Sequence, residues 1–475
     1  MIFEAIKDKE NAFFLDSSLH RGPLGRYSFL GFEPFYIFKA KGQEDSLNQL
    51  RELLKRYQLV NPAPRAKARG FTGGGVNTKF PFLGGAVGYL AYDFGLSLEN
   101  IKEKAKDDLA LPDVFWGFYD TVIAVDHWKK KLTIFSTGFP EKGSFLAKKH
   151  SEQRLKQFIQ ELSKQGRHCE KADKPTKQSK ARDCFAIARN DKLAIKLTSN
   201  FTKEEYLKAV AKAKDYIRKG DIYQVNLSQR FSAETTLNSF NLYQRLRQVS
   251  PSDFSACLDC GDFQIISSSP ERFLNFDGKN VSTRPMKGTR PRGINSRADA
   301  RHKRDLLQSP KDKAELLMIV DLLRNDLGRV CKYGSVRVSS MRALEAYSTV
   351  YQTTASIEGV LYPGQDRIDL LKACFPGGSI TGCPKIRSMQ IIDELEPTQR
   401  SIYTGCLGYL GFNNTMDLNI LIRTILKKND TIYFQAGGGI VADSQPESEY
   451  QETLTKAQGI FKALGNNKQD NENLV

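Results

Sequence analysis

The sequence predicts an α+β fold in which antiparallel β-sheets pack as a sandwich and helices lie on the outside. Short runs of alternating apolar residues, broken by Gly, Pro and Asn, fill the first 40 residues, a pattern typical of antiparallel strands. Alternation returns at residues 221–231 and 418–425. Helical periodicity separates these runs, and one helical segment begins at Thr202 with Glu205 three residues later, the pattern of a capping box.

The chain has 475 residues, 40% of them hydrophobic, which is enough for two or three domains with apolar cores. We expect an amino-terminal scaffold domain of regulatory type at residues 1–165 and a second domain, which holds the functional site, at residues 185–465. Residues 166–184 are rich in Lys and Arg and lack large apolar side chains, which predicts a charged linker. We expect a disordered tail at residues 466–475.

The chain is strongly basic, with a formal net charge of +17. Nucleic-acid-binding proteins concentrate such charge in a stripe or tail, whereas here Lys and Arg are spread along the whole chain, so we expect no nucleic-acid partner. Small anionic substrates remain compatible with this charge. No apolar run approaches 18 residues and no export signal opens the chain, so we expect a cytoplasmic protein that does not cross a membrane. The single CxxC motif has no second pair, which favours structural thiols over a zinc site.

Two predicted helices each carry a pair of carboxylates on one face. Asp312 and Glu315 lie three residues apart after a Ser-Pro helix start, and Glu449 and Glu452 have the same spacing. Two acid pairs that face one cleft suit a hard divalent cation such as Mg²⁺. The alternative is that these acids only complement helix dipoles, which is sufficient for Asp312 but not for Glu452, a full turn further into its helix.

The segment VSTRPMKGTRPRG, residues 281–293, fixes Lys287 between two prolines and directly before Gly288. An amine that is held rigidly and removed from water loses its proton more easily and becomes a nucleophile. Glu271 lies sixteen residues earlier, at the end of a predicted strand, so a hairpin could bring the two side chains together as acid and nucleophile. The alternatives are a solvated basic turn and a surface ion pair of Glu271 with Arg272.

The segment PMKGTRPRG resembles the PIKGT motif of the chorismate-utilising enzymes, and GGSITGCPK, residues 377–385, resembles their GGSxTGxPK signature. The resemblance is nearly continuous from residue 200 to 464 and weaker over residues 1–165. The lysine form of the motif resembles the aminodeoxychorismate synthase component I branch, whereas anthranilate synthase component I carries alanine at this position. The resemblance implies the fold of anthranilate synthase component I.

The resemblance also implies roles for individual residues. Lys287 would attack chorismate, and Glu271 would protonate the departing hydroxyl. Mg²⁺ would be held by Glu315 and Glu452, with Asp312 and Glu449 as an outer pair. The implied substrate-binding residues are Tyr409, Arg423, Gly438, Gly439, Lys456, Thr381 and Gln224.

Two glutamines lie at positions that distinguish branches of the family. Gln224 stands where members that add water carry a lysine, and an amide cannot act as a base near neutral pH, so the resemblance implies use of ammonia. Gln352 stands where the family commonly has histidine, and glutamine can form hydrogen bonds but cannot shuttle a proton.

The implied activity is amination of chorismate to 4-amino-4-deoxychorismate, on the route to p-aminobenzoate and folate. The sequence has no Gly-x-Cys-x-Gly elbow, so the ammonia source is expected to be a separate glutamine amidotransferase subunit. Anthranilate synthase component I, of tryptophan biosynthesis, is the alternative within the family, and a non-catalytic basic binding protein is the alternative from another class. Asp16 and Ser17 lie on a predicted hairpin that resembles a tryptophan-sensing element of the anthranilate enzymes, and a hairpin that only packs is the other interpretation.

Overall fold

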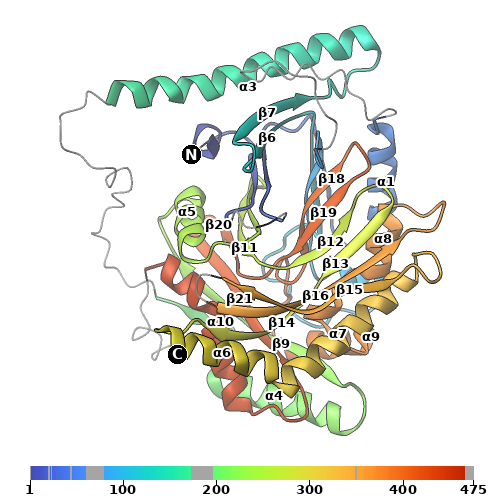
Figure 1. Ribbon diagram of the computed structural model, residues 1–475, viewed down its shortest axis with the longest axis vertical. Coiled ribbons are helices and arrows are strands. Elements are labelled where there is room, and N and C mark those ends of the chain that lie inside the picture. The colour runs from blue at the N-terminus through green and yellow to red at the C-terminus, as the bar shows by residue number, and fades with distance from the viewer. Residues whose placement is uncertain are drawn as a thin grey trace.

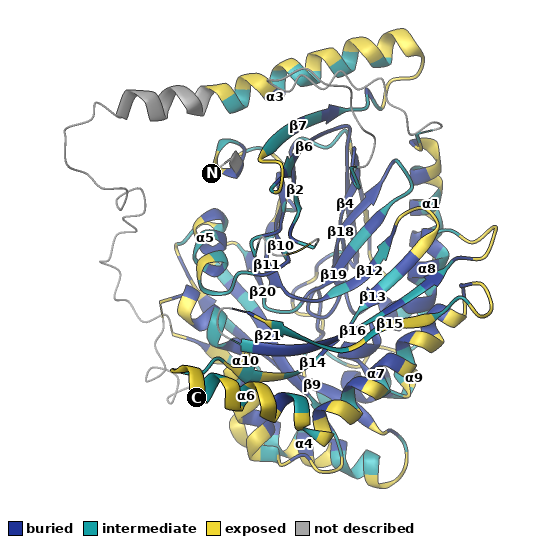
Figure 2. Cartoon of the chain, viewed as in Figure 1, coloured by how far each residue is buried: buried dark blue, intermediate teal, exposed yellow. Residues whose placement is uncertain are grey.

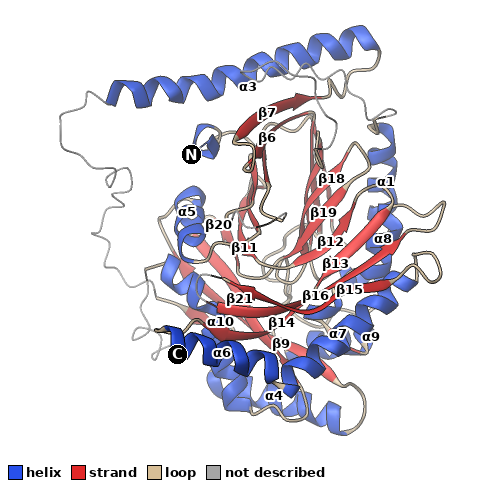
Figure 3. Ribbon diagram, in the orientation of Figure 1, coloured by secondary structure: helices blue, strands red, loops and turns tan. Residues whose placement is uncertain are grey.

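The computed structural model describes residues 2–19, 22, 24–42, 45–59, 80–172, 196–347 and 350–465. Two large sheets, antiparallel in every strand pair, face each other as a sandwich, and helices cover their outer faces (Figures 1 and 3). This arrangement confirms the predicted α+β sandwich. Within the described residues, no helix is both long and apolar enough to span a membrane.

The first sheet has the strand order β17-β9-β21-β20-β11-β10-β1-β2-β6-β7, with β8 beside β9. Its strands are β1 (Phe13–Asp16), β2 (Tyr27–Gly31), β6 (Thr121–Asp126), β7 (Lys131–Ser136), β8 (Thr198–Ser199), β9 (Gln224–Glu234), β10 (Phe254–Asp259), β11 (Phe263–Ser269), β17 (Gly382–Cys383), β20 (Thr424–Lys428) and β21 (Thr431–Ile440).

The second sheet has the order β14-β16-β13-β12-β19-β18-β4-β5-β3, with β15 beside β16. Its strands are β3 (Tyr36–Ala40), β4 (Gly85–Leu90), β5 (Val114–Tyr119), β12 (Arg272–Phe276), β13 (Asn280–Arg284), β14 (Met286–Pro291), β15 (Arg337–Ala346), β16 (Val350–Val360), β18 (Cys406–Gly411) and β19 (Met416–Ile420).

The helices lie outside the sandwich and show the alternation of buried and exposed faces that surface helices require (Figure 2). They are α1 (Ser46–Arg56), α2 (Phe94–Leu98), α3 (Ser144–Ala172), α4 (Lys203–Arg218), α5 (Ser239–Val249), α6 (Ser296–Gln308), α7 (Pro310–Gly328), α8 (Arg367–Cys374), α9 (Lys385–Leu395) and α10 (Pro446–Ala463), with short 3-10 turns at η1 (Ile2–Ala5) and η2 (Gly378–Ile380).

Two helices begin with the N-caps that the sequence predicts. At the start of α4, the Thr202 hydroxyl accepts a hydrogen bond from the Glu205 N–H, and the Glu205 carboxylate accepts one from the Thr202 N–H, which confirms the capping box. Ser309 caps α7 by accepting from the Asp312 N–H, with Pro310 in the first turn.

Both halves of the chain contribute strands to both sheets. Strand β1 pairs with β10, with Leu15 opposite Ala256, and β4 pairs with β18, with Val87 opposite Tyr409. Segments 1–165 and 185–465 therefore share a continuous pair of sheets, and the boundary expected at residues 166–184 does not separate two sheets. Helix α3 continues to Ala172, so the first part of the expected linker is helical, whereas its remainder and the expected tail lie outside the described residues.

Apolar side chains fill three layers. Between the sheets, Phe13, Phe115 and Leu407 belong to a buried cluster drawn from both sheets. A second cluster packs α5 and α10 against the first sheet. A third packs α1, α7 and α8 against the second sheet and also includes residues of α4, α9, β9 and β21. Because the sheets are fixed from both sides, the ends of their central strands provide a rigid support for functional side chains.

Candidate active site

Lys287 lies at a β-bulge between β14 and β16. The register shifts between Lys287 and Thr289, and Gly288 adopts a φ of +73°, a conformation that favours glycine. A Cβ on Gly288 would lie 2.9 Å from Leu306 Cδ1, so a larger residue would not fit there. The Thr353 hydroxyl donates a hydrogen bond to the Lys287 carbonyl, which fixes the backbone from which the amine extends.

The Lys287 side chain is half-buried and forms no ion pair within the described part of the chain. Burial lowers the pKa of the Lys287 amine, and although the carboxylate of Glu315 opposes this shift, the net change is downward. The position of Lys287 within strand β14 and the downward shift of its pKa both favour a nucleophilic amine over a solvated basic turn, and the catalytic role of Lys287 stays a prediction.

Glu271 lies between β11 and β12 and is 5% exposed. The Ser379 hydroxyl donates a 2.6 Å hydrogen bond to Glu271 Oε1. Burial raises the pKa of the Glu271 carboxyl to about 7, although Ser379 and the charge of Lys287 act in the opposite direction. Burial thus shifts both Glu271 and Lys287 toward their neutral forms, which are those of a proton donor and a nucleophile.

The raised pKa of Glu271 predicts a pH-dependent loss of stability. A buried acid whose folded-state pKa lies above its ordinary value stabilises the fold below the ordinary value, and this contribution is lost as the pH rises through about 7. Between pH 5 and pH 8 we expect the free energy of unfolding of the wild type to fall by about 2–3 kcal/mol more than that of Glu271→Gln. Urea unfolding of both proteins at several pH values tests this, and parallel pH profiles would contradict it.

Glu449 and Glu452 lie side by side over Gly438. A Cβ on Gly438 would lie 3.2 Å from Glu452 Oε1 and 3.3 Å from Glu449 Oε2. Burial raises the pKa of Glu449, and the charge of Glu452 contributes to the rise. Burial also opposes ionisation of Glu452, but Lys456, whose Nζ lies 2.7 Å from Glu452 Oε1, lowers the Glu452 pKa overall. Gly438 therefore provides the space that two converging carboxylates need.

Asp312 and Glu315, the two acids near the start of α7, interact with different cations. The carboxylate of Glu315 is half-buried and acts electrostatically on Lys287, with Lys311 Nζ 4.0 Å from its Oε1. Asp312 is instead held by Arg290, whose Nη2 lies 2.8 Å from Asp312 Oδ2. Thus Glu315 is directed toward the site, whereas Asp312 is engaged in an ion pair.

No group of three or more His, Cys, Asp or Glu side chains in the described ranges is arranged as a preformed metal site. The adjacent carboxylates of Glu449 and Glu452 nevertheless form a donor pair that suits Mg²⁺, which takes few protein carboxylates and completes its coordination with water or substrate oxygens.

One edge of β21 is open near the glycines. Pairing of β21 with β20 ends at Phe434, whereas pairing with β9 continues to Ile440. Gly438 and Gly439 therefore have no β20 partner on this edge, and backbone N–H groups there suit an anion. The amide of Gln224 lies over Gly439, because a Cβ on Gly439 would be 2.1 Å from Gln224 Nε2.

Two cationic side chains predicted to bind substrate, Lys456 and Arg423, differ in the contacts that they make. Lys456 Nζ donates to the Gly437 carbonyl at 2.9 Å as well as to Glu452. Arg423 is half-buried with a φ of +51°, and its guanidinium forms no ion pair within the described ranges. Burial lowers the Arg423 pKa. A guanidinium without a partner suits bidentate binding of a carboxylate.

The side chains of Thr381 and Gln352 form hydrogen bonds within the protein. Thr381 is fully buried, and its hydroxyl lies 3.1 Å from the Gly377 carbonyl, within its own loop. Gln352 is 7% exposed and donates from Nε2 to the Thr289 hydroxyl at 3.3 Å.

Tyr409 does not lie with the other predicted site residues. It lines a separate cavity between the β1–β2 hairpin and strands β18 and β19, and its ring stacks on Phe82 with a centroid distance of 4.5 Å. Asp417 and Arg272 form an ion pair at the same cavity. The side chain of Tyr409 belongs to the buried cluster between the sheets, and its expected role in binding substrate with Arg423 stays a prediction.

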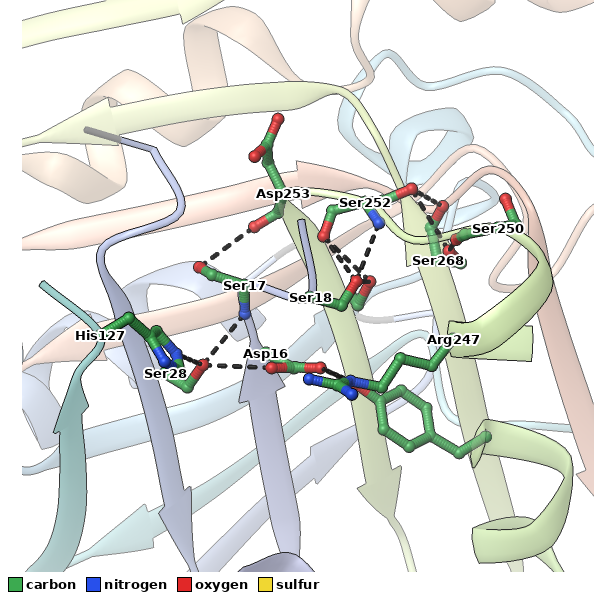
Figure 4. A network of polar contacts seen from close by, with 12 residues as sticks. Asp16, Ser17, Ser18, Ser28, His127, Arg247, Ser250, Ser252, Asp253 and Ser268 are labelled. Carbon is green, nitrogen blue, oxygen red and sulfur yellow. Dashed lines mark hydrogen bonds and ion pairs between the residues drawn. The ribbon is translucent and has the colours of Figure 1, made fainter. Parts of the chain in front are cut away.

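The hairpin that carries Asp16 and Ser17 is tied down by a polar network (Figure 4). Asp16 accepts hydrogen bonds from the Tyr243 hydroxyl at 2.7 Å and from the Ser28 hydroxyl at 3.1 Å, and it pairs with Arg247 of α5. These contacts join the hairpin to α5.

Arg400 and Glu396 form a buried ion pair that the sequence did not reveal. Arg400 and Glu396 are 2% and 4% exposed, and Arg400 Nη2 lies 2.7 Å from Glu396 Oε1. Arg400 also donates to the carbonyls of Asn226 and Ile380, at 2.7 Å and 3.0 Å. The pair therefore links β9 to the loop that carries Ser379. The four-residue spacing of Glu396 and Arg400 gave no signal beyond that of a surface helix pair.

Comparisons with known proteins identify a family and individual relatives of this chain. A family model described as "chorismate binding enzyme" matches residues 10–462. Aminodeoxychorismate synthase component 1 of Bacillus subtilis (strain 168) is 37% identical over 445 residues, which cover 93% of this chain and 89% of the relative. Anthranilate synthase component 1 of Acetivibrio thermocellus is 36% identical over 465 residues, which cover 98% and 92%.

Among solved structures, anthranilate synthase component I from Streptococcus pneumoniae TIGR4 matches with a TM-score of 0.74 and 32% identity, covering 93% of each chain. The two named activities occur among relatives of almost equal identity, so overall similarity does not distinguish between them.

Proposed function

The chain belongs to the family of chorismate-binding enzymes, and from this membership we propose that it combines chorismate with ammonia to form 4-amino-4-deoxychorismate. Membership of an enzyme family favours catalysis over the alternative of a non-catalytic basic binding protein. The choice within the family depends on one observation, which is the desolvated amine of Lys287 beside the buried carboxyl of Glu271.

In the proposed reaction, Lys287 and Glu271 act together. The neutral amine of Lys287 forms a bond to C2 of chorismate, the ring double bond shifts, and the C4 hydroxyl leaves as water after taking the proton of Glu271. Ammonia then forms a bond to C4, the double bond shifts back, and the C2–N bond to Lys287 breaks. The excess proton of the new amine returns to the Glu271 carboxylate. Ammonia is consumed, one water is released, and the pyruvate-derived side chain stays attached.

The remaining charges fit a doubly anionic substrate. Arg423, whose guanidinium has no ion-pair partner in the described ranges, and the open edge of β21 at Gly438 and Gly439 would bind carboxylates. Glu452, Glu449 and Glu315 would hold Mg²⁺, which would supply positive charge for a substrate carboxylate. Asp312, whose carboxylate pairs with Arg290, would remain an outer acid beside this set.

The nitrogen source would be a separate glutamine amidotransferase. Relatives named "component 1" imply a second component, and the sequence contains no glutaminase elbow of its own. The isolated chain should therefore use ammonium salts directly.

Product analysis of the wild-type chain with chorismate, Mg²⁺ and ammonium chloride tests the proposal. We expect 4-amino-4-deoxychorismate without release of pyruvate. Fluorescent anthranilate with an equal amount of pyruvate would overturn the assignment and identify the anthranilate reaction instead. Absence of any reaction of chorismate would overturn both.

The proposed metal site predicts a loss of Mg²⁺ affinity in Glu452→Gln. Removing one of few charged ligands should weaken binding on the order of 100-fold, measured by calorimetric titration with magnesium chloride alone. Glu447→Gln is the matched control on the same helix, since Glu447 pairs with Lys203 at the surface and should bind Mg²⁺ as the wild type does. Equal affinity of Glu452→Gln and wild type would exclude Glu452 as a ligand.

A further inference from the structure

The carboxyl of Glu271 receives a hydrogen bond from a serine that lies 108 positions later in the sequence. The Ser379 hydroxyl donates to Glu271 Oε1 at 2.6 Å, and Ser379 and Glu271 are only 7% and 5% exposed. A hydrogen bond between buried groups is stronger than one in water, because its surroundings screen it less. Ser379 can therefore influence the reaction through the acid that it contacts.

The loop that carries Ser379 is fixed on both sides of the serine. Ser379 lies in η2, and the next carbonyl in the chain, that of Ile380, accepts a hydrogen bond from the buried Arg400 at 3.0 Å. The Thr381 hydroxyl donates to the Gly377 carbonyl at 3.1 Å, which closes the loop on itself. The backbone that presents Ser379 is therefore held in place beside the acid.

The backbone of Glu271 is fixed as well. Its N–H donates to the Ser269 hydroxyl at 3.3 Å, and its carbonyl accepts from the Ile420 N–H at 3.0 Å. The Ser269 hydroxyl in turn donates to the Ile420 carbonyl at 2.6 Å. Since Ser379 and Glu271 both extend from fixed backbone, the fold itself sets the direction of the hydrogen bond between them.

This hydrogen bond also determines which oxygen of the neutral carboxyl carries the proton. In a protonated carboxyl, the carbonyl oxygen is the stronger acceptor, and the other oxygen is the O–H donor. Because Oε1 accepts from Ser379, the proton of neutral Glu271 resides on Oε2. Without the Ser379 hydroxyl, the proton would be distributed between the two oxygens.

Besides Ser379, groups on β14, on α10 and after β15 act on the Glu271 carboxyl. They are the amines of Lys287 and Lys456, the Met286 N–H and the hydroxyl of Tyr347. Burial raises the Glu271 pKa, and among the groups that oppose this rise Ser379 has the largest effect, followed by Lys287. Tyr347 is neutral near pH 7, because burial raises its pKa. Ser379 thus has more influence on the protonation of Glu271 than the neighbouring amines have.

We propose that Ser379 is a positioning residue for the catalytic acid, whose carboxyl it orients and whose proton it keeps on Oε2, an inference that rests on the proposed function. In the reaction, the proton on Oε2 passes to the departing C4 hydroxyl, and the negative charge stays on the Glu271 carboxylate. The Ser379 hydroxyl keeps its own proton and donates to Oε1 before and after this transfer. It therefore orients the acid and stabilises the carboxylate that the transfer leaves behind.

The kinetic test measures amination of chorismate by the full chain at saturating Mg²⁺ and ammonium chloride. In Ser379→Ala we expect kcat to fall on the order of 10- to 100-fold, because the acid loses its fixed orientation. The KM for chorismate should stay within about twofold of wild type, since Ser379 acts through Glu271 and not on the substrate carboxylates. Ser379→Thr retains the hydroxyl and should keep kcat within about threefold of wild type.

A second measurement follows the protonation of Glu271 without any substrate. Each protein is compared with its matched Glu271→Gln variant by urea unfolding across a pH series. The stability that neutral Glu271 contributes is lost as the pH rises, and the loss ends at the folded-state pKa, about 7 in the wild type. Removal of the Ser379 hydroxyl raises this pKa further, so in Ser379→Ala the loss should end about one pH unit higher.

Ser269→Ala is the matched control for the pH series. It also removes a buried serine hydroxyl beside Glu271, but this hydroxyl contacts only the backbone N–H of Glu271 and the Ile420 carbonyl. The variant should be less stable than wild type at every pH, whereas the pH at which the Glu271 contribution is lost should stay the same. A purely structural loss therefore differs from a change at the carboxyl.

The outcomes separate this inference from the proposed function. A wild type that aminates chorismate, with an unchanged kcat in Ser379→Ala, would overturn the positioning role alone. An unchanged Glu271 pKa in Ser379→Ala would also overturn it, because the hydroxyl would then not act on the carboxyl. A wild type that forms no C–N bond from ammonium would overturn both the proposed function and the positioning role.

Discussion

Lys287→Ala is expected to reduce formation of 4-amino-4-deoxychorismate on the order of 10³-fold or more at saturating ammonium. The variant removes the only group proposed to bond to C2, and ammonia cannot replace it there, because ammonia is proposed to react at C4. The KM for chorismate should change little, since carboxylate binding is assigned to Arg423 and the β21 edge. Chromatographic product analysis at several ammonium concentrations measures both quantities.

Lys279→Ala provides the matched control for this experiment. Lys279 lies in the exposed turn that precedes β13, so its removal also lowers the net charge by one but leaves the site intact. Its rate should equal that of wild type. Wild-type rates in Lys287→Ala would show that the amine does not take part in the reaction, and the desolvation of Lys287 would then need a structural explanation.

Glu396→Gln is expected to destabilise the protein by about 3–5 kcal/mol, the largest effect on stability that the structure predicts for a single substitution. Arg400 is 2% exposed, so the variant leaves an uncompensated guanidinium in the interior. Glu396 also accepts hydrogen bonds from the N–H and the hydroxyl of Ser228, which would lose a charged partner. Urea unfolding at pH 7 measures the change.

Two further variants test whether the destabilisation by Glu396→Gln comes from the buried charge of Arg400 or only from the loss of a contact. The double variant Arg400→Met/Glu396→Leu removes both charges and should recover part of the lost stability. Asp215→Asn breaks an exposed ion pair with Arg218 and should change the free energy of unfolding by no more than about 0.5 kcal/mol. If Glu396→Gln and Asp215→Asn had equal effects, burial of the Arg400 charge would not be the cause.

The sequence predicted the elements that depend on local chemistry. The capping box at Thr202 and the capped start of α7 at Ser309 appear as expected, because a cap requires only residues within one helical turn. The irregular setting of Lys287 was also predictable, because Gly288 next to a lysine in a strand is typical of a bulge.

The elements that depend on distant partners were not predictable in this way. Tyr409 lines a cavity together with the β1–β2 hairpin, and alternation along β18 does not reveal which layer of a two-sheet sandwich each face contacts. Asp312 is engaged by Arg290, a residue 22 positions away. The role of Glu396 depends on the contacts of Arg400, which joins a strand and a loop far apart in sequence.

The sharing of both sheets by the two halves of the chain also constrains how the protein can evolve. Residues on β1 and β10, or on β4 and β18, face each other across strand pairs, so a substitution in one half is selected in the context of the other. Recombination between homologous genes at the segment that joins the halves would pair β1 from one gene with β10 from another. The two paired strands would then not have been selected together. Exchange of one half alone is therefore expected to disturb both sheets, and new specificities are expected to be more accessible through substitutions at strand ends and loops.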